Sequence, residues 1–130
     1  MELFTTEQLE QLKKNGANRD QNHTPVVKLF TPDANATWLI SEIDPDEPRL
    51  AFGLCDLGMG FPELGYVDLN EIKSVRGTLG LPVERDLNFE GLYPMTVYAD
   101  AARMAEQITT SETLLLQATN LRKQKNKLQP

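Results

Sequence analysis

The sequence predicts an α+β fold: a single domain whose antiparallel meander sheet, of about four to five strands, packs with an N-terminal helix, a short capped helix and C-terminal helices. The 130 residues are 40% hydrophobic and 25% charged, which suits one domain with an ordinary core. Several β-prone segments follow one another with short turns between them, and helical spacing appears towards both ends. We therefore expect a domain over residues 1–108, followed by a C-terminal helix and basic tail over residues 109–130.

The first helix is expected over residues 5–15. Thr5 and Gln8 form a capping box, because the Thr hydroxyl accepts from the Gln8 backbone N–H while the Gln side chain reaches back. At the other end, Asn15 and Gly16 supply the left-handed stop that helices favour.

Four strands follow, separated by turn residues. The turns at 31–35 and 44–48 contain Pro, Asp and Asn or Glu, and Pro and Asx residues favour turn backbone conformations. Both turns are too short for a crossover, so the strands on either side should pair antiparallel. The expected strands are 26–30, 37–43, 50–57 and 64–67.

A short capped helix is expected next, near residues 69–76. Asp68 is placed to cap it, with Glu71 at the third position of the helix. Gly77 stands where a left-handed residue would end the helix. An extended segment over 83–89 then provides a further strand.

Two helices are expected at the C-terminal end. Apolar residues recur at helical intervals between Thr96 and Ile108. Thr109 and Glu112 form another capping box, which separates a second helix from the first. The apolar face of this second helix holds Leu114, Ala118 and Leu121.

Charge is distributed unevenly along the chain. The net charge is −6, although the last ten residues carry four basic side chains and no acidic one. The acidic body should repel phosphates, so direct nucleic-acid binding is expected only through the basic tail. Cys55 is the single cysteine, no signal peptide begins the sequence, and no apolar run approaches the roughly 20 residues that cross a bilayer. We expect a cytoplasmic protein without membrane contacts.

Several strings along the chain carry a resemblance to a known family. They are PVVKLF at 25–30, ATWL at 36–39, AFGLCDLG at 51–58, PELGYV at 62–67, RG at 76–77 and GLPVERD at 80–86. In this order they resemble the bacterial family labelled domain of unknown function 2958, over roughly residues 3–105. The resemblance implies a bacterial protein, often encoded on plasmids and other mobile elements, and it implies no particular reaction or catalytic residue.

Three adjacent charges, Glu84-Arg85-Asp86, interrupt an otherwise apolar segment. Because successive strand residues point to opposite faces, at least one of these charges should point inward. One interpretation is an internal ion pair with Arg76 or Arg49. The other is a polar binding pocket formed by Trp38, Glu63, Tyr66, Glu84, Arg85 and Asp86.

The last helix has the pattern of a partner-binding helix, because such helices dock through residues at i, i+4 and i+7. The candidate residues are Leu114, Ala118, Leu121, Arg122 and Lys125. The alternatives are packing of this face on the domain itself, or a contact between two copies of the chain.

No catalytic residue, metal site or cofactor is assigned. His23 has no nearby Ser or Cys arrangement, and Cys55 has no flanking cation to lower its pKa. The preferred function is that of a non-enzymatic accessory protein of bacterial mobile elements that binds an unidentified protein partner; one form of it is an acidic decoy that occupies a DNA-binding protein. The alternative is a small metal-dependent hydrolase or nuclease with carboxylates at Glu63, Glu84 and Asp86. The oligomeric state is left open.

Overall fold

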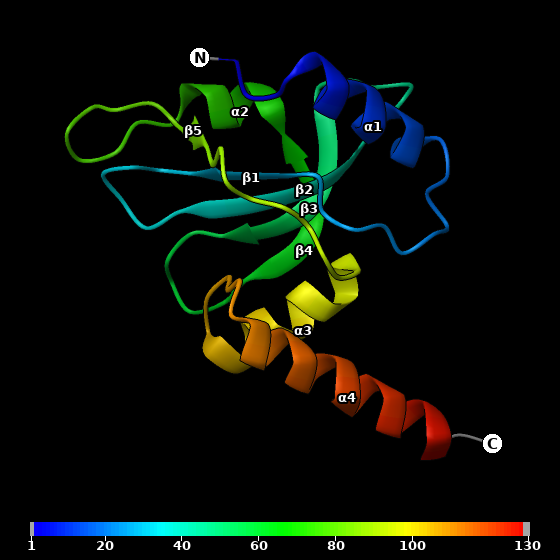
Figure 1. Ribbon diagram of the computed structural model, residues 1–130. Coiled ribbons are helices and arrows are strands. Elements are labelled where there is room, and N and C mark those ends of the chain that lie inside the picture. The colour runs from blue at the N-terminus through cyan, green and yellow to red at the C-terminus, as the bar shows by residue number, and fades with distance from the viewer. Residues whose placement is uncertain (1, 129–130) are drawn as a thin grey trace.

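The computed structural model describes residues 2–128, in which a five-stranded sheet lies between two pairs of helices (Figure 1). Helices α1 and α2 cover one face, and α3 and α4 lie on the other. The predicted α+β class is confirmed. The last two residues of the predicted tail fall outside the described part of the chain. In chain order the elements are α1 (Thr6–Gly16), β1 (Val27–Phe30), β2 (Thr37–Ile43), β3 (Leu50–Asp56), β4 (Glu63–Asp68), α2 (Leu69–Ser74), β5 (Glu84–Arg85), α3 (Met95–Ala105) and α4 (Glu112–Leu128).

The sheet is open and antiparallel, with strand order β4-β3-β2-β1-β5. Strands β1 to β4 form the predicted meander, and β5 pairs with the free side of β1. β5 is much shorter than the extended segment expected over 83–89. The reason is a turn just after it, where Asp86 Oδ1 accepts a 2.8 Å hydrogen bond from the backbone N–H of Asn88.

Helix α1 begins at the predicted capping box. The backbone N–H of Gln8 donates to Thr5 Oγ1 at 3.0 Å, and the N–H of Thr5 donates to Gln8 Oε1 at 2.9 Å. The predicted left-handed stop is wrong, because the helix runs on through Gly16 into Ala17, which has φ −74° and ψ −11°. Gly16 serves close packing instead: a Cβ there would lie 1.8 Å from the backbone oxygen of Ile43 in β2.

Helix α2 begins at the predicted cap but ends earlier than expected. Asp68 accepts a 2.8 Å hydrogen bond from the backbone N–H of Asn70, and this bond lowers the pKa of the Asp68 carboxyl. Val75 is already extended, with φ −66° and ψ 136°, so a left-handed stop at Gly77 is wrong. The chain comes close to Asp33 at this glycine, where an added Cβ would lie 1.8 Å from Asp33 Oδ1.

Each face of the sheet carries its own hydrophobic core. Side chains alternate between the faces of a strand, so Trp38 and Ile40 of β2 face α1 and α2 while Leu39 faces α3. The first core contains Leu3, Leu12, Val27, Leu29, Trp38, Ile40, Ile43, Ala51, Leu69, Ile72 and Val83. The second contains Leu39, Leu54, Met95, Val97, Tyr98, Ala99, Ala101, Ala102, Leu115 and Ala118.

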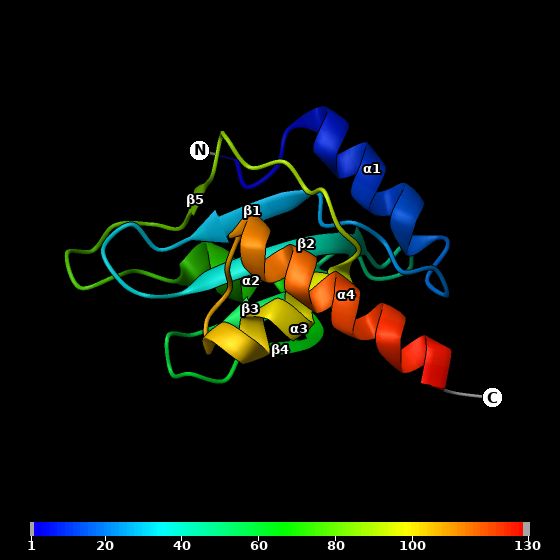
Figure 2. The same ribbon diagram turned by 60° about the horizontal axis from the view of Figure 1, so that its bottom comes forward.

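The two C-terminal helices are present, but the cap between them is not the predicted one. Thr109 Oγ1 accepts from the N–H of Ser111, and it is Ser111 Oγ that accepts from the N–H of Leu114, at 3.4 Å. Figure 2 shows α4 running along α3, with its C-terminal end reaching past the sheet. Within residues 2–128, no helix is long and apolar enough to cross a membrane.

Candidate functional site

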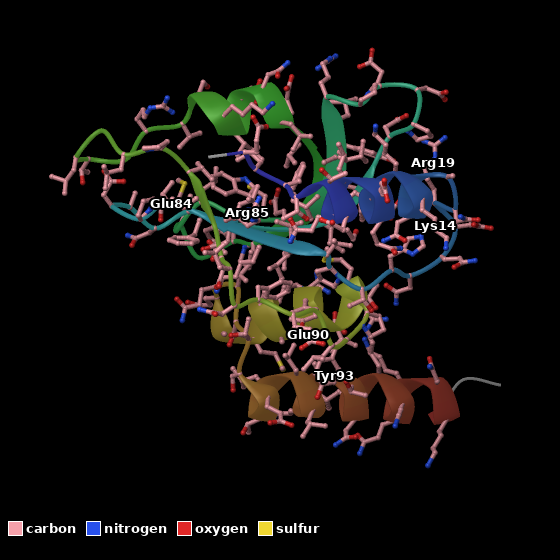
Figure 3. The ribbon with its side chains drawn as sticks, turned by 45° about the horizontal axis from the view of Figure 1, so that its top comes forward. Lys14, Arg19, Glu84, Arg85, Glu90 and Tyr93 are labelled. Atoms are coloured by element: carbon pink, nitrogen blue, oxygen red, sulfur yellow. The ribbon has the colours of Figure 1, made fainter. Side chains whose placement is uncertain are left out.

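The predicted polar pocket is not assembled. Glu63 and Tyr66 lie on β4, whereas Glu84 and Arg85 form β5 at the opposite edge, with three strands between them. Figure 3 shows Glu84 and Arg85 on the segment that leads towards α3, apart from Arg19, which follows α1. The sixth member, Trp38, is a core residue that is only 3% exposed. The pocket fails because the last strand joins the sheet beside β1 and not beside β4.

The three charged residues at 84–86 do not form one cluster, and each has different surroundings. Lys28 Nζ lies 3.6 Å from Asp86 Oδ2, and Arg85 Nη1 donates to the backbone oxygen of Glu2 at 3.0 Å. Glu84 is exposed to solvent. An ion pair is present, but its partner is neither of the expected arginines. Arg49 pairs with Glu47 and Asp68. Arg76 donates to the backbone oxygens of Lys73 and Val75.

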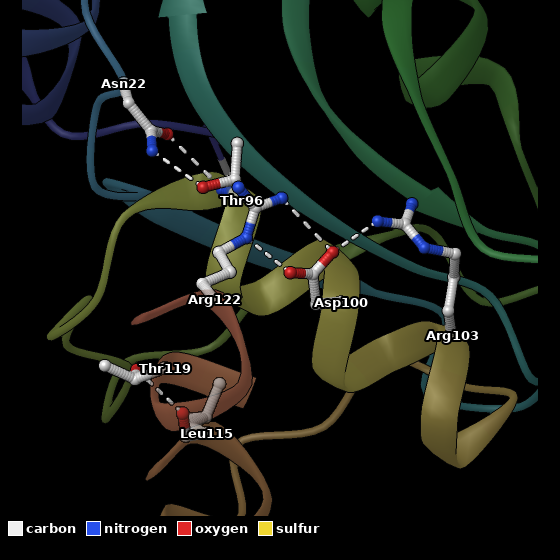
Figure 4. A network of polar contacts seen from close by, with 7 residues as sticks. All are labelled: Asn22, Thr96, Asp100, Arg103, Leu115, Thr119 and Arg122. Carbon is white, nitrogen blue, oxygen red and sulfur yellow. Dashed lines mark hydrogen bonds and ion pairs between the residues drawn. The ribbon is translucent and has the colours of Figure 1, made fainter. Parts of the chain in front are cut away.

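The face of α4 that was expected to bind a partner lies partly against the domain itself. Leu115 and Ala118 are buried against α3. Asp100 of α3 forms ion pairs with Arg122 of α4 and with Arg103 (Figure 4). The remaining candidates are less enclosed: Leu114 is half-buried, while Leu121 and Lys125 are exposed. This arrangement agrees with the alternative of packing within one chain.

A surface rich in exposed apolar side chains runs from the β3–β4 loop onto β4. We call it the open-edge surface; it consists of Leu57, Met59, Phe61, Leu64 and Tyr66. Its loop part surrounds a hollow of about 240 Å³, which Cys55 and Glu63 also line. A second hollow connects Phe61 with Leu64. Exposed apolar side chains gathered in this way are typical of interaction sites.

Strand β4, which carries Leu64 and Tyr66 of this surface, is a terminal strand of the sheet. Among the described residues, no strand pairs with its outer side. Its pairing with β3 is regular from Cys55↔Glu63 to Leu50↔Asp68, without a bulge, and β4 contains neither Lys nor Pro. Bulges, Lys and Pro are the devices that usually protect an edge strand from further pairing. β4 is therefore free to accept another strand.

Four residues of this surface are not predicted from the sequence as site residues: Leu64 on β4, and Leu57, Met59 and Phe61 in the loop before it. A signal was present for the loop residues, because these large apolar side chains alternate with glycines in a turn, where polar residues are usual. Gly58 and Gly60 have φ values of 80° and 86°, so the loop needs glycine to hold this shape.

A polar cleft of about 630 Å³ lies between the β1–β2 turn and the end of α3. Its buried acid, Asp56, is fully engaged: Oδ1 accepts from the N–H of Gly58 at 2.8 Å, and Oδ2 accepts from the N–H of Ile108 at 2.9 Å. Asp56 thus ties the hairpin loop to the end of α3. Among residues 2–128, no group of three or more His, Cys, Asp or Glu is placed to hold a metal ion.

The single cysteine and the single histidine have structural surroundings. Burial raises the pKa of the Cys55 thiol, with Asp56 and Glu63 adding to the rise, so the thiol stays protonated at neutral pH. His23 Nε2 lies 2.7 Å from the backbone oxygen of Asn18, to which it donates. Neither residue has the neighbours of an activated nucleophile.

Comparison with known proteins gives one match. Residues 3–109 match the model of a family described as "Protein of unknown function (DUF2958)". The chain belongs to the DUF2958 family. No curated protein and no solved structure matches it. Within this DUF2958 protein, the match spans the sheet and helices α1 to α3, including the whole open-edge surface.

Helix α4 lies outside the residues matched to DUF2958, and its attachment gives a testable prediction. Burial alone would raise the pKa of Asp100, but Arg122 and Arg103 together lower it below the ordinary 3.8. A lowered pKa contributes stability above pH 3.8 and loses it as the pH falls through the value in the folded protein. Asp100→Asn should therefore cost about 1 kcal/mol at neutral pH and flatten the loss of stability on acidification.

Urea unfolding followed by circular dichroism between about pH 3 and pH 7 measures this difference. Asp20→Asn is the control, because the structure gives Asp20 no ion pair among the described residues. Equal pH profiles for wild type and Asp100→Asn would contradict the assigned role of Asp100.

Proposed function

We propose that the protein is a non-enzymatic binding module that docks an extended, basic segment of another protein along the open-edge surface. The observation that carries the proposal is the coincidence of an unpaired strand, β4, with five exposed apolar side chains. In strand addition, main-chain hydrogen bonds supply affinity, and contacts with alternate side chains supply specificity. Leu64 and Tyr66 point to one face of β4 and would make such alternate contacts.

Charge supports a basic partner. The protein has a net charge of −6, and β4 begins with Glu63 and ends with Asp68. Charges of opposite sign on facing strands attract, whereas like charges directly opposite each other destabilise the pair. A second copy of this chain is disfavoured for that reason, because the antiparallel register that pairs all of β4 with itself places Glu63 opposite Asp68.

An acidic decoy of a DNA-binding protein is one version of this proposal, because DNA-binding proteins carry basic surfaces. A role in a bacterial mobile element remains a prediction of the same kind. The alternative of a hydrolase with Glu63, Glu84 and Asp86 gains no support, since Glu63 lies at the opposite edge of the sheet from Glu84.

The proposal is tested with a display library of short random peptides selected on the intact protein. We expect enriched peptides that alternate apolar and basic residues. Their binding should slow hydrogen exchange of the β4 amides, and Phe61→Ser should weaken them at least about tenfold. Leu79→Ser is the matched control, because Leu79 is 80% exposed and Phe61 79%, but Leu79 lies in the loop before β5.

Failure to enrich any peptide, or equal losses in the two variants, would overturn the proposal. So would a dimer in sedimentation experiments that Phe61→Ser disrupts, because the surface would then be occupied by a second copy of the chain.

A further inference from the structure

A β-bulge in β2 turns a carboxylate toward α3. The register with β3 shifts between Ile40 and Glu42, which makes Ser41 an extra residue in β2. Without the bulge, Glu42 would point to the same face as Ile40. With it, Ile43 joins Ile40 in the core beneath α1, and Glu42 lines a cavity on the α3 side.

This cavity has a volume of about 260 Å³ and lies between the sheet, the loop 19–23 and the start of α3. Phe52, Leu64 and Met95 form an apolar wall. Asn22 and Thr96 form a polar wall, and two hydrogen bonds join them (Figure 4). Asn22 Nδ2 donates to Thr96 Oγ1 at 2.7 Å, and the backbone N–H of Thr96 donates to Asn22 Oδ1 at 3.3 Å.

Glu42 is the one acidic residue lining this cavity that is buried, being only 7% exposed. Within residues 2–128, no group donates a hydrogen bond to its carboxylate or forms an ion pair with it. Its carboxylate oxygens are not fully enclosed and are reached from the cavity, so a donor bound there can form a charged hydrogen bond with them. Burial raises the pKa of Glu42, against the opposing influence of His23 and Arg19.

We propose that this cavity binds a primary alkylammonium group, whose N–H donors meet Glu42 while its alkyl chain packs on Phe52, Leu64 and Met95. The oxygens of Asn22 and Thr96 offer further acceptors, and the Phe52 ring adds attraction for a cation. A metal ion fits this cavity poorly, because hard divalent cations take about six oxygen ligands and the wall here is largely apolar.

Two basic side chains, Arg19 and His23, line the cavity, but neither forms an ion pair with Glu42. Arg19 is directed outward, with Nη1 3.9 Å from Asp44 Oδ2 and a side chain that is 56% exposed. His23 uses its Nε2 proton on the backbone oxygen of Asn18. A bound ammonium would be repelled by Arg19, so Arg19→Ala should bind it more tightly than the wild type does.

The experiment is an NMR titration of the intact protein with n-butylammonium, with neutral 1-butanol as the matched probe. We expect saturable shifts of the backbone amides of Glu42 and Thr96 with the amine only. Glu42→Gln should weaken binding at least about tenfold, whereas Glu63→Gln, which alters an exposed carboxylate, should not change it. Arg19→Ala should strengthen it, which keeps the proposal testable if Glu42→Gln does not fold.

The ammonium group can come from a free amine or from a lysine of a partner protein. Comparing the affinities of n-butylammonium and Nα-acetyl-lysine N-methylamide distinguishes these two sources. Tighter binding of the blocked lysine assigns the site to a protein partner, and tighter binding of butylammonium assigns it to a small amine. Binding that survives in Glu42→Gln, or equal binding of 1-butanol, would overturn the proposal. Phe61→Ser should leave amine binding intact, because Phe61 does not line the cavity, and this variant separates the inference from the proposed function although Leu64 belongs to both sites.

Discussion

Replacing Trp38 with alanine is expected to lower the free energy of unfolding by about 3–5 kcal/mol. Trp38 is 3% exposed and belongs to the core between the sheet and helices α1 and α2. Removing its indole leaves a cavity that close-packed neighbours fill only in part. Urea unfolding followed by far-UV circular dichroism measures the loss, because this signal does not depend on the deleted tryptophan.

Tyr66→Ala is the control for this prediction. Tyr66 is 52% exposed and contacts Phe52 edge to face, with ring centroids 5.4 Å apart, so its loss should cost only about 1 kcal/mol. Its main effect should be on peptide binding. If Trp38→Ala unfolds at the same urea concentration as the wild type, Trp38 is not a core residue and its predicted place in a binding pocket regains support.

Gly53→Ala is expected to lower the free energy of unfolding by about 3 kcal/mol. A Cβ at this position of β3 would lie 2.0 Å from the backbone oxygen of Leu39 and 3.0 Å from its carbonyl carbon. A backbone cannot move aside as a flexible side chain can, so β2 and β3 would have to separate beside the bulge at Ser41.

The cross-strand neighbour of Gly53 provides a matched control. Gly65 of β4 pairs with Gly53, and a Cβ at Gly65 meets no atom within 4 Å. Neither glycine has a positive φ, so backbone strain does not separate them. Gly65→Ala should therefore change the stability by less than about 1 kcal/mol. Thermal unfolding of both variants checks the contrast, and similar losses would contradict the close approach of β2 and β3.

Local chemistry explains which elements could be predicted from the sequence. The caps at Thr5 and Asp68 involve residues two or three positions apart, and the turns between β1, β2 and β3 contain their own Pro and Asx residues. The helices and strands that these caps and turns delimit therefore lie close to their predicted ranges. Two strands that follow each other across a short turn pair antiparallel, so their pairing can be predicted without information from elsewhere in the chain.

The wrong predictions about the binding pocket and the glycines involve residues far away in the chain. Nothing local to Glu84 specifies whether its strand joins β1 or β4, and that choice alone separates Glu84 from Glu63. Glycine is ambiguous for a related reason. The sequence predicts left-handed residues at Gly16 and Gly77, whereas the structure needs glycine there because a Cβ would clash with Ile43 or Asp33.

The site residues found only in the structure follow the same rule. The bulge at Ser41 depends on the pairing of β2 with β3, and without it the sequence places Glu42 on the opposite face. The exposure of Phe61 depends on no helix or strand covering the hairpin loop. Both are properties of the assembled sheet.

The two cores constrain where recognition can take place. Because helices cover both faces of the sheet, every β2 residue from Trp38 to Ile43 is buried, and consecutive positions of that strand are committed to packing. A partner can reach the sheet only around its perimeter, through the outer strands, the loops and the cavity at the bulge. Substitutions that change contacts between the sheet and a partner therefore belong at its rim, whereas substitutions at its centre should lower the stability of the fold.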